Sequence, residues 1–247
     1  MRLARFTVGG RTLLGKLAGD DVIDLPGVSP AIPNDMIELL RGGGPLLALA
    51  ERAQKRSGFT YSLADVGLEA PVPNPGKYLA IGLNYGSHVA EAARVGVQNP
   101  QAQVWFNKQV SCVRYMVAND VSVRDWQMMT PTWTLGKSFD THGPIGPYLV
   151  TTDEIPDPQN LQLWLTVNGV ERQCSSTRHM IHDIRHQIAH LTKVMTLMPG
   201  DLIATGTPEG VGVAMKPPTY LKVGDVVRAQ IERIGYIESE VIEEPWK

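Results

Sequence analysis

The stretch from Met116 to Asp140, MVANDVSVRDWQMMTPTWTLGKSFD, is the part of the chain on which the prediction of the fold rests. It opens with a short apolar run that predicts a buried strand, and Asp120 follows at the end of that run. Lys137 comes later, next to Gly136, and a glycine lets the backbone approach a ligand closely. A carboxylate at a strand end is a common metal ligand. A turn-capping aspartate and a surface lysine would give the same pattern, so these residues alone leave both interpretations open.

The composition is that of an ordinary soluble globular protein. With 247 residues, the chain can form one large domain or two small ones. Its net charge of −2 gives no electrostatic reason to expect nucleic acid or an anionic membrane as a partner. The two cysteines, Cys112 and Cys174, form no metal-binding pattern and leave a disulfide open. Since no secretory signal is evident and no apolar run could span a bilayer, we expect a cytoplasmic protein.

Residues 1–70 predict a small α+β domain. Short apolar runs separated by Gly9-Gly10 and by Gly19-Asp20-Asp21 are typical of a β-meander. Two helices are expected next, one opened by Pro33-Asn34-Asp35 and one from about Pro45 to Arg56. We expect no catalytic group in this domain, and a proline-rich segment connects it to the remainder.

Residues 71–247 predict a second, strand-rich domain. An apolar strand is expected at Tyr78–Leu83, and the turn Asn168-Gly169 predicts a hairpin. The segment Asp225–Glu244 alternates well enough to form a final antiparallel pair. Because the chain lacks the βαβ alternation of a nucleotide-binding fold, the predicted class is strand-rich α+β.

His88 and Glu91 stand three residues apart in GLNYGSHVAE, at the start of a predicted helix. At this spacing their side chains lie on one helix face and can hydrogen-bond. A carboxylate that orients an imidazole is the arrangement that general-base catalysis needs. Most such pairs, however, lie on exposed surfaces, so the bare pattern favours a surface pair.

Five segments, taken together and in this order, resemble the fumarylacetoacetate hydrolase family. They are GLNYGSHVAE, VWFNK, VANDVSVRDWQ, GKSFD and TGTPEGVG. The resemblance covers nearly the whole chain, and five matches are far more specific than any one alone. It implies a mixed β-sandwich roll of the family's C-terminal type for residues 71–247, a small N-terminal domain, and assembly as a homodimer.

The resemblance also implies roles for individual residues. Asp120 would bind a divalent metal, Mg²⁺ or Mn²⁺. His88 and Glu91 would lie on a mobile lid and activate water, while Lys137 would stabilise oxyanion or enolate charge. The weaker candidates for substrate contacts are Tyr85, Gln127, Gly206 and Thr207.

These roles predict a metal-dependent enzyme that acts on a small 2-oxo or 1,3-diketo acid, as in aromatic catabolism. Hydrolysis of a C–C bond in a 2,4-dioxo, acylpyruvate-type acid is the first expectation, with the metal and Lys137 stabilising the released enolate. A decarboxylase or a keto–enol isomerase on a related acid is the alternative, because the same electrophilic centre would serve all three reactions.

One departure from the family's pattern is large. Relatives carry a strand with a Glu-x-Glu pair, then a helix, between the segments that correspond to VWFNK and ANDVS. Here VSC runs directly into VRYMVANDVS, so two of the three usual metal-binding carboxylates are absent. Either the chain is a non-catalytic family member that has lost its metal, or residues are missing between Cys112 and Val113.

We favour missing residues, because the flanking segments look intact. This hypothesis predicts that the Cα atoms of Cys112 and Val113 lie well beyond the separation of about 3.8 Å across a trans peptide. If instead the two residues are bonded and Asp120 binds a metal, Glu91 and Asp140 are the first candidates to replace the glutamates.

Overall fold

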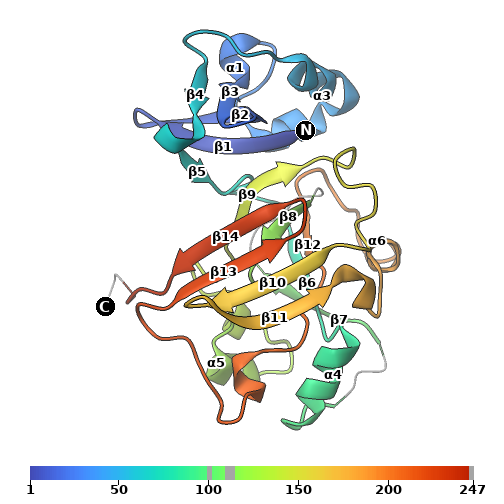
Figure 1. Cartoon of the computed structure of the whole chain (residues 1–247). Helices are drawn as coiled ribbons and strands as arrows, with labels where there is room; N and C mark the ends of the chain where they lie inside the picture. The colour runs from blue at the N-terminus through green and yellow to red at the C-terminus, as the bar shows by residue number, and fades with distance from the viewer. Residues whose placement is uncertain (99–101, 109–114, 245–247) are drawn as a thin grey trace.

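The structure is a computed structural model that describes residues 1–98, 102–108 and 115–244. The junction between Cys112 and Val113, where missing residues are predicted, lies outside the described residues. Strands in mostly antiparallel sheets dominate, and the helices are short, which confirms the predicted strand-rich α+β class (Figure 1). None of the described helices combines the length and hydrophobicity needed to cross a membrane.

The N-terminal part is a meander followed by two helices, as predicted. Asp35 is the N-cap of the first helix, accepting a hydrogen bond from the backbone N–H of Glu38 at 2.9 Å. The second helix ends at Arg52 rather than near Arg56, because Lys16 donates hydrogen bonds to its terminal carbonyl groups. The elements are β1 (Arg2–Val8), β2 (Arg11–Ala18), β3 (Asp21–Asp24), α1 (Leu25–Val28), α2 (Met36–Arg41), α3 (Gly43–Arg52), β4 (Thr60–Ser62), η1 (Leu63–Asp65) and β5 (Gly67–Glu69).

The remaining elements form two further sheets and the helices around them. They are β6 (Tyr78–Gly82), α4 (Gly86–Ala93), β7 (Val104–Lys108), β8 (Tyr115–Ala118), α5 (Arg124–Met128), η2 (Leu135–Lys137), β9 (Ile145–Val150), β10 (Gln162–Val167), β11 (Val170–Ser176), η3 (Thr177–His179), α6 (Ile184–Leu191), β12 (Leu202–Ala204), η4 (Gly212–Ala214), β13 (Val226–Ile231) and β14 (Gly235–Glu240). The predicted hairpin and the predicted final pair are both present. Asn168 and Gly169 both have positive φ, as a two-residue hairpin turn requires.

The first sheet crosses the predicted domain boundary. Its strand order is β4-β3-β2-β1-β9-β8, and β1 pairs with β9 through Arg2–Val150 and Leu3–Leu149. The main hydrophobic cluster likewise joins Leu3 and Leu14 of the N-terminal strands to Leu149 and Tyr78. The N-terminal part is therefore built onto the strand pair that leads to Asp120.

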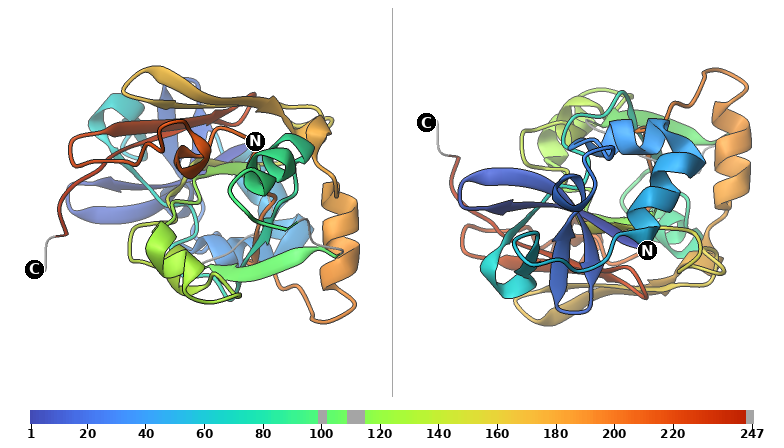
Figure 2. Two further views of the ribbon diagram at one scale, coloured as in Figure 1. Left: turned by 90° about the horizontal axis from the view of Figure 1, so that it is seen from below. Right: turned by 90° about the horizontal axis from the view of Figure 1, so that it is seen from above.

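The other sheets are β11-β10-β13-β14 and the short β12-β6-β7. In Figure 1, helices α4 and α5 lie at the end of the molecule away from β1–β4, and the left view of Figure 2 looks at this end directly. The loops that follow β6 and β8 therefore deliver their polar residues to the same end.

Candidate functional site

Asp120 and Lys137 are brought together as an ion pair. Asp120 follows β8 and Lys137 is the last residue of η2, and the Lys137 Nζ lies 2.6 Å from the Asp120 Oδ2. Their side chains are only 8% and 21% exposed for Lys137 and Asp120 respectively. The ammonium also lies over the Phe106 ring of β7, 5.2 Å from its centroid. The pair is thus a partly desolvated concentration of charge and not two independent surface groups.

A close approach of two backbone segments places Lys137. Gly136 packs directly on Gln127 of α5, and a Cβ atom at position 136 would lie 2.3 Å from the Gln127 backbone nitrogen. The backbone N–H of Val123 donates to the Gly136 carbonyl at 2.9 Å. The glycine before Lys137 is therefore needed for packing between η2 and α5.

Replacing Gly136 by alanine is expected to destabilise the fold by about 1–3 kcal/mol and to displace Lys137, because backbone atoms cannot move aside as a flexible side chain would. Thermal unfolding and turnover of the variant would measure both effects. Gly67→Ala is the matched control, since a Cβ there would meet nothing within 4 Å. Equal melting temperatures for the two variants would contradict the packing argument.

His88 and Glu91 form a buried pair on α4. The His88 Nδ1 lies 3.0 Å from the Glu91 Oε2, and the two side chains are 14% and 12% exposed. The second oxygen of Glu91 accepts a hydrogen bond from the backbone N–H of Gly210 at 2.9 Å. The surface pair favoured by the bare pattern is therefore wrong. The reason is a distant loop, which covers the pair and holds the carboxylate.

The imidazole of His88 is kept neutral. Burial lowers its pKa most, Glu91 raises it, and the nearby cations Arg124 and Lys137 lower it again, with a net shift below the ordinary value. With Nδ1 bonded to Glu91, Nε2 is the nitrogen available to take a proton. The pair thus has the electrostatics of a general base at neutral pH.

Arg124 is a member of the site that sequence reasoning missed. This half-buried residue opens α5, and its Nη1 donates to the Gln127 Oε1 at 2.5 Å. Burial lowers the pKa of its guanidinium, while Asp120 and Glu91 are among the charges that raise it. Its position between Asp120 and Gln127 in VANDVSVRDWQ is the sequence signal that could have revealed it.

The remaining candidates lie around the loop after β12. Gly206 has φ of +112°, and a Cβ there would lie 2.9 Å from the Cβ of Asn84. Thr207 accepts a hydrogen bond from Gln173 at 3.0 Å. Tyr85 is fully buried, with its ring beside Gly206, so its predicted contact with substrate requires access that this conformation does not give.

Asn84, a second residue missed in the sequence, holds this loop in place. Its buried amide donates to the carbonyl groups of Thr205 and His182 at 2.8 and 2.9 Å and accepts from the backbone N–H of His182. Each functional atom of the side chain is thus used to join β6 to the segments before α6 and after β12. Substituting it would shift the backbone of Gly206.

The described residues do not by themselves form a metal centre. Within ranges 1–98, 102–108 and 115–244, no three His, Cys, Asp or Glu side chains are placed to hold one ion. Asp120 pairs with Lys137, and Glu91 is bonded to His88 and Gly210. Asp140, the other candidate replacement, is exposed. The requirement for Mg²⁺ or Mn²⁺ stays a prediction from the resemblance.

Comparisons with known proteins agree with this arrangement. The model of the fumarylacetoacetate (FAA) hydrolase C-terminal family matches residues 112–242. Oxaloacetate tautomerase fahd2, mitochondrial, from Xenopus laevis is 37% identical over 269 positions, which cover 91% of this chain and 83% of the relative. The corresponding FAHD2A protein of Bos taurus is 35% identical, covering 91% and 85%.

Two solved structures share the fold. Fumarylacetoacetate hydrolase from Exiguobacterium antarcticum superposes with a TM-score of 0.80 at 28% identity, covering 99% of this chain and 100% of the other. Maleylpyruvate hydrolase from Sphingobium sp. SYK-6, in complex with manganese(II) and pyruvate, gives a TM-score of 0.71 at 31% identity, covering 98% and 99%. These similarities extend over both the N-terminal and the C-terminal parts.

The alignment with the Xenopus protein bears on the large departure from the family's pattern. It extends over 269 positions, more than the 247 residues of this chain. The relative therefore has residues at positions where this chain has none. Such an excess is what the absence of a strand and a helix would produce.

Proposed function

Because this chain belongs to the fumarylacetoacetate hydrolase family, we propose that it is an enzyme that interconverts the keto and enol forms of a small 2-oxo dicarboxylate such as oxaloacetate. The observation that carries this proposal is the buried His88–Glu91 pair, which lies within electrostatic reach of Arg124 and Lys137. The names of the curated relatives, which are oxaloacetate tautomerases, support the substrate class.

The proposed reaction is a proton transfer between carbon and oxygen. His88 Nε2 takes a proton from the carbon next to the keto group, and the electrons of that C–H bond form the C=C bond. The carbonyl π electrons move to the keto oxygen, which becomes an enolate oxygen. The same proton, or one from water, is then delivered to that oxygen to give the enol. Glu91 stabilises the transient imidazolium, because its carboxylate lies 3.0 Å from Nδ1.

The two cations meet the negative charge of the substrate. Lys137, fixed by Asp120, is the group assigned to the enolate oxygen, where charge develops during the reaction. Arg124 presents a planar fork of N–H donors, which suits a substrate carboxylate. Proton transfer thus asks only for a base and preorganised cations, and the described residues supply both.

Hydrolysis of an acylpyruvate-type acid is the second candidate. It is favoured by the likeness to maleylpyruvate hydrolase, whose structure was solved with manganese(II) and pyruvate. In that reaction His88 would deprotonate a water molecule instead of a carbon acid. We assign no step to a metal ion here, because the described residues do not complete a site for one.

One pair of assays separates the candidates. The purified protein is expected to accelerate the ketonisation of enol-oxaloacetate, followed by loss of its ultraviolet absorbance, and to release little pyruvate from acylpyruvates. Both assays are run with Mg²⁺, with Mn²⁺ and with a chelator. Pyruvate release without tautomerisation would favour the hydrolase, and a folded protein inactive in every condition would favour the non-catalytic alternative.

The pH dependence of tautomerisation follows from the lowered pKa of His88. The base works only when neutral, so kcat/KM is expected to be level near pH 7 and to fall at acidic pH, with a midpoint below the ordinary histidine value of about 6.5. The free energy of unfolding should also decrease as pH falls through that range, because the unfolded chain binds the proton more readily. An acidic limb centred above 6.5 would contradict this assignment.

A further inference from the structure

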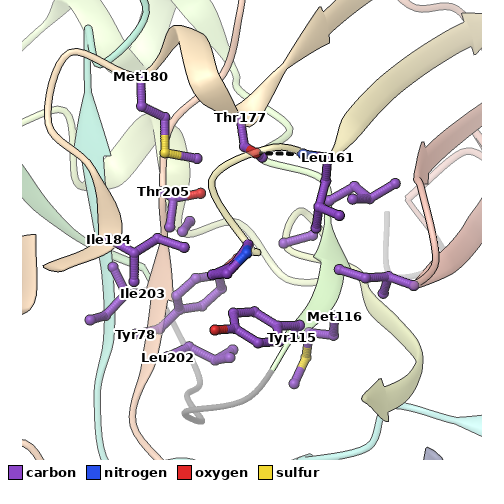
Figure 3. Close-up of a pocket in the computed structure, with 15 residues that line it drawn as sticks. Tyr78, Tyr115, Met116, Leu161, Thr177, Met180, Ile184, Leu202, Ile203 and Thr205 are labelled. Atoms are coloured by element: carbon purple, nitrogen blue, oxygen red, sulfur yellow. Dashed lines mark hydrogen bonds between the residues drawn. The ribbon is translucent and has the colours of Figure 1, made fainter. Parts of the chain in front are cut away.

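A cavity of about 100 Å³ lies in the interior, behind the strand ends that carry the site. Its walls come from β6, β8, β12 and β13 and from the segment that leads into α6 (Figure 3). Such a volume is several times what one water molecule needs. The labelled side chains that surround it are largely hydrocarbon, among them Met116, Leu161, Ile184, Leu202 and Ile203.

One polar group in this wall lacks a hydrogen-bond partner. Tyr78 is only 2% exposed, and its hydroxyl is bonded to no atom of the part of the chain that the structure describes. A buried hydroxyl without a partner costs about 1–3 kcal/mol, so such groups normally face a water or a ligand. Burial, with a smaller contribution from Asp120, raises the Tyr78 pKa, so the hydroxyl stays protonated and can donate.

The other polar atoms of the wall offer little to water. The Thr177 hydroxyl accepts a hydrogen bond from the Leu161 backbone at 2.9 Å, and the Met180 sulfur accepts from two glutamine amides. A buried water generally needs two to four polar partners, and apolar cavities tend to stay dry and to bind small apolar molecules. No residue that lines the cavity carries an ionised side chain, which disfavours a charged ligand.

We propose that this cavity is a binding site for a small uncharged molecule, or part of one, with an apolar body and one hydrogen-bond acceptor that meets the Tyr78 hydroxyl. The source is either the remote end of a substrate bound at the neighbouring site or a separate small ligand. The first source rests on the proposed function, since Tyr78 lies within electrostatic reach of Asp120. The second source does not.

Phenol is the probe, because it combines one ring with one hydroxyl oxygen. Isothermal titration calorimetry is expected to show one phenol bound per chain. Tyr78→Phe, which keeps the ring and removes the hydroxyl, should weaken phenol binding roughly three- to tenfold and leave benzene binding unchanged. Tyr236→Phe is the matched control, since Tyr236 is exposed on β14 and should bind phenol like the parent protein.

Filling the cavity tests its location. Ile184→Phe, made on a helix that carries none of the site residues, is expected to abolish phenol binding while the melting temperature stays close to that of the parent. If this variant does not fold, nuclear Overhauser contacts from phenol to the methyl groups of Ile184 and Met180 in the parent protein provide the same information. Absence of binding, absence of these contacts, or binding unaffected by either substitution at Tyr78 and Ile184 would overturn the proposal.

A competition experiment then identifies the source. Phenol that raises KM for oxaloacetate without changing kcat would connect the cavity to the substrate, whereas phenol that binds equally well with and without oxalate would indicate a separate ligand. Binding is measured without turnover. A protein that binds phenol but does not convert oxaloacetate would therefore refute the proposed function and leave this site intact.

Discussion

Replacing His88 by glutamine is expected to lower kcat for tautomerisation by about a hundredfold to ten-thousandfold, the range typical for loss of a general base. Glutamine keeps hydrogen-bonding capacity toward Glu91 but cannot take a proton at neutral pH. The measurement is initial-rate kinetics on enol-oxaloacetate, with circular dichroism to show that the fold is retained. The acidic limb of the pH profile should also disappear.

The chain contains its own control for this experiment. His186 pairs with Asp183 at 3.0 Å and the same helical spacing, but its side chain is 75% exposed. Because a solvated pair has neither the burial nor the neighbouring cations of His88–Glu91, His186→Gln should leave kcat unchanged. If His88→Gln and His186→Gln both turned over like the parent protein, the buried pair would have no part in the reaction.

Replacing Lys137 by methionine is expected to reduce kcat by about a hundredfold or more, because a preorganised charge at a developing oxyanion is worth several kcal/mol. The substitution also leaves Asp120 without its ammonium partner, and breaking a buried ion pair costs roughly 3–5 kcal/mol. Stability therefore has to be measured alongside turnover. Lys137→Arg should restore part of the stability but little of kcat, since a guanidinium places its charge differently.

Lys77 supplies the matched control. Its Nζ lies 2.7 Å from the Asp201 Oδ2, and Asp201 is almost fully buried, yet this pair anchors the start of β6 away from the site residues. Lys77→Met should lower the melting temperature with little change in kcat. A similar fall in kcat for both lysine variants would mean that lost stability, and not lost charge at the enolate, explains the effect at Lys137.

The sequence was sufficient for local features. The Asn168-Gly169 turn, the Asp35 cap and the first helix that it begins depend on a few adjacent residues, and all three are present. The motif GKSFD likewise identified a lysine that proves to be buried next to Asp120. Such features are decided by backbone preferences and short-range spacing, which one sequence displays directly.

Features that depend on distant contacts were less accessible. The burial of His88 and Glu91 depends on the Gly210 loop, more than a hundred residues away, so helical spacing alone gave the wrong environment. Arg124 was overlooked because an arginine in a short helix is usually a solvated charge. Its proximity to Glu91 arises only when the loops after β6 and β8 meet at one end of the molecule.

The pairing of β1 with β9 has a consequence for how the protein is made. Arg2 and Leu3 find their partners only at Val150 and Leu149, so this edge of the first strand stays incomplete until more than half of the chain has emerged from the ribosome. Contacts of such long sequence separation slow folding, and an unpaired strand edge invites association with other chains. During synthesis, the first strand should therefore be the part of the nascent chain most dependent on chaperone protection.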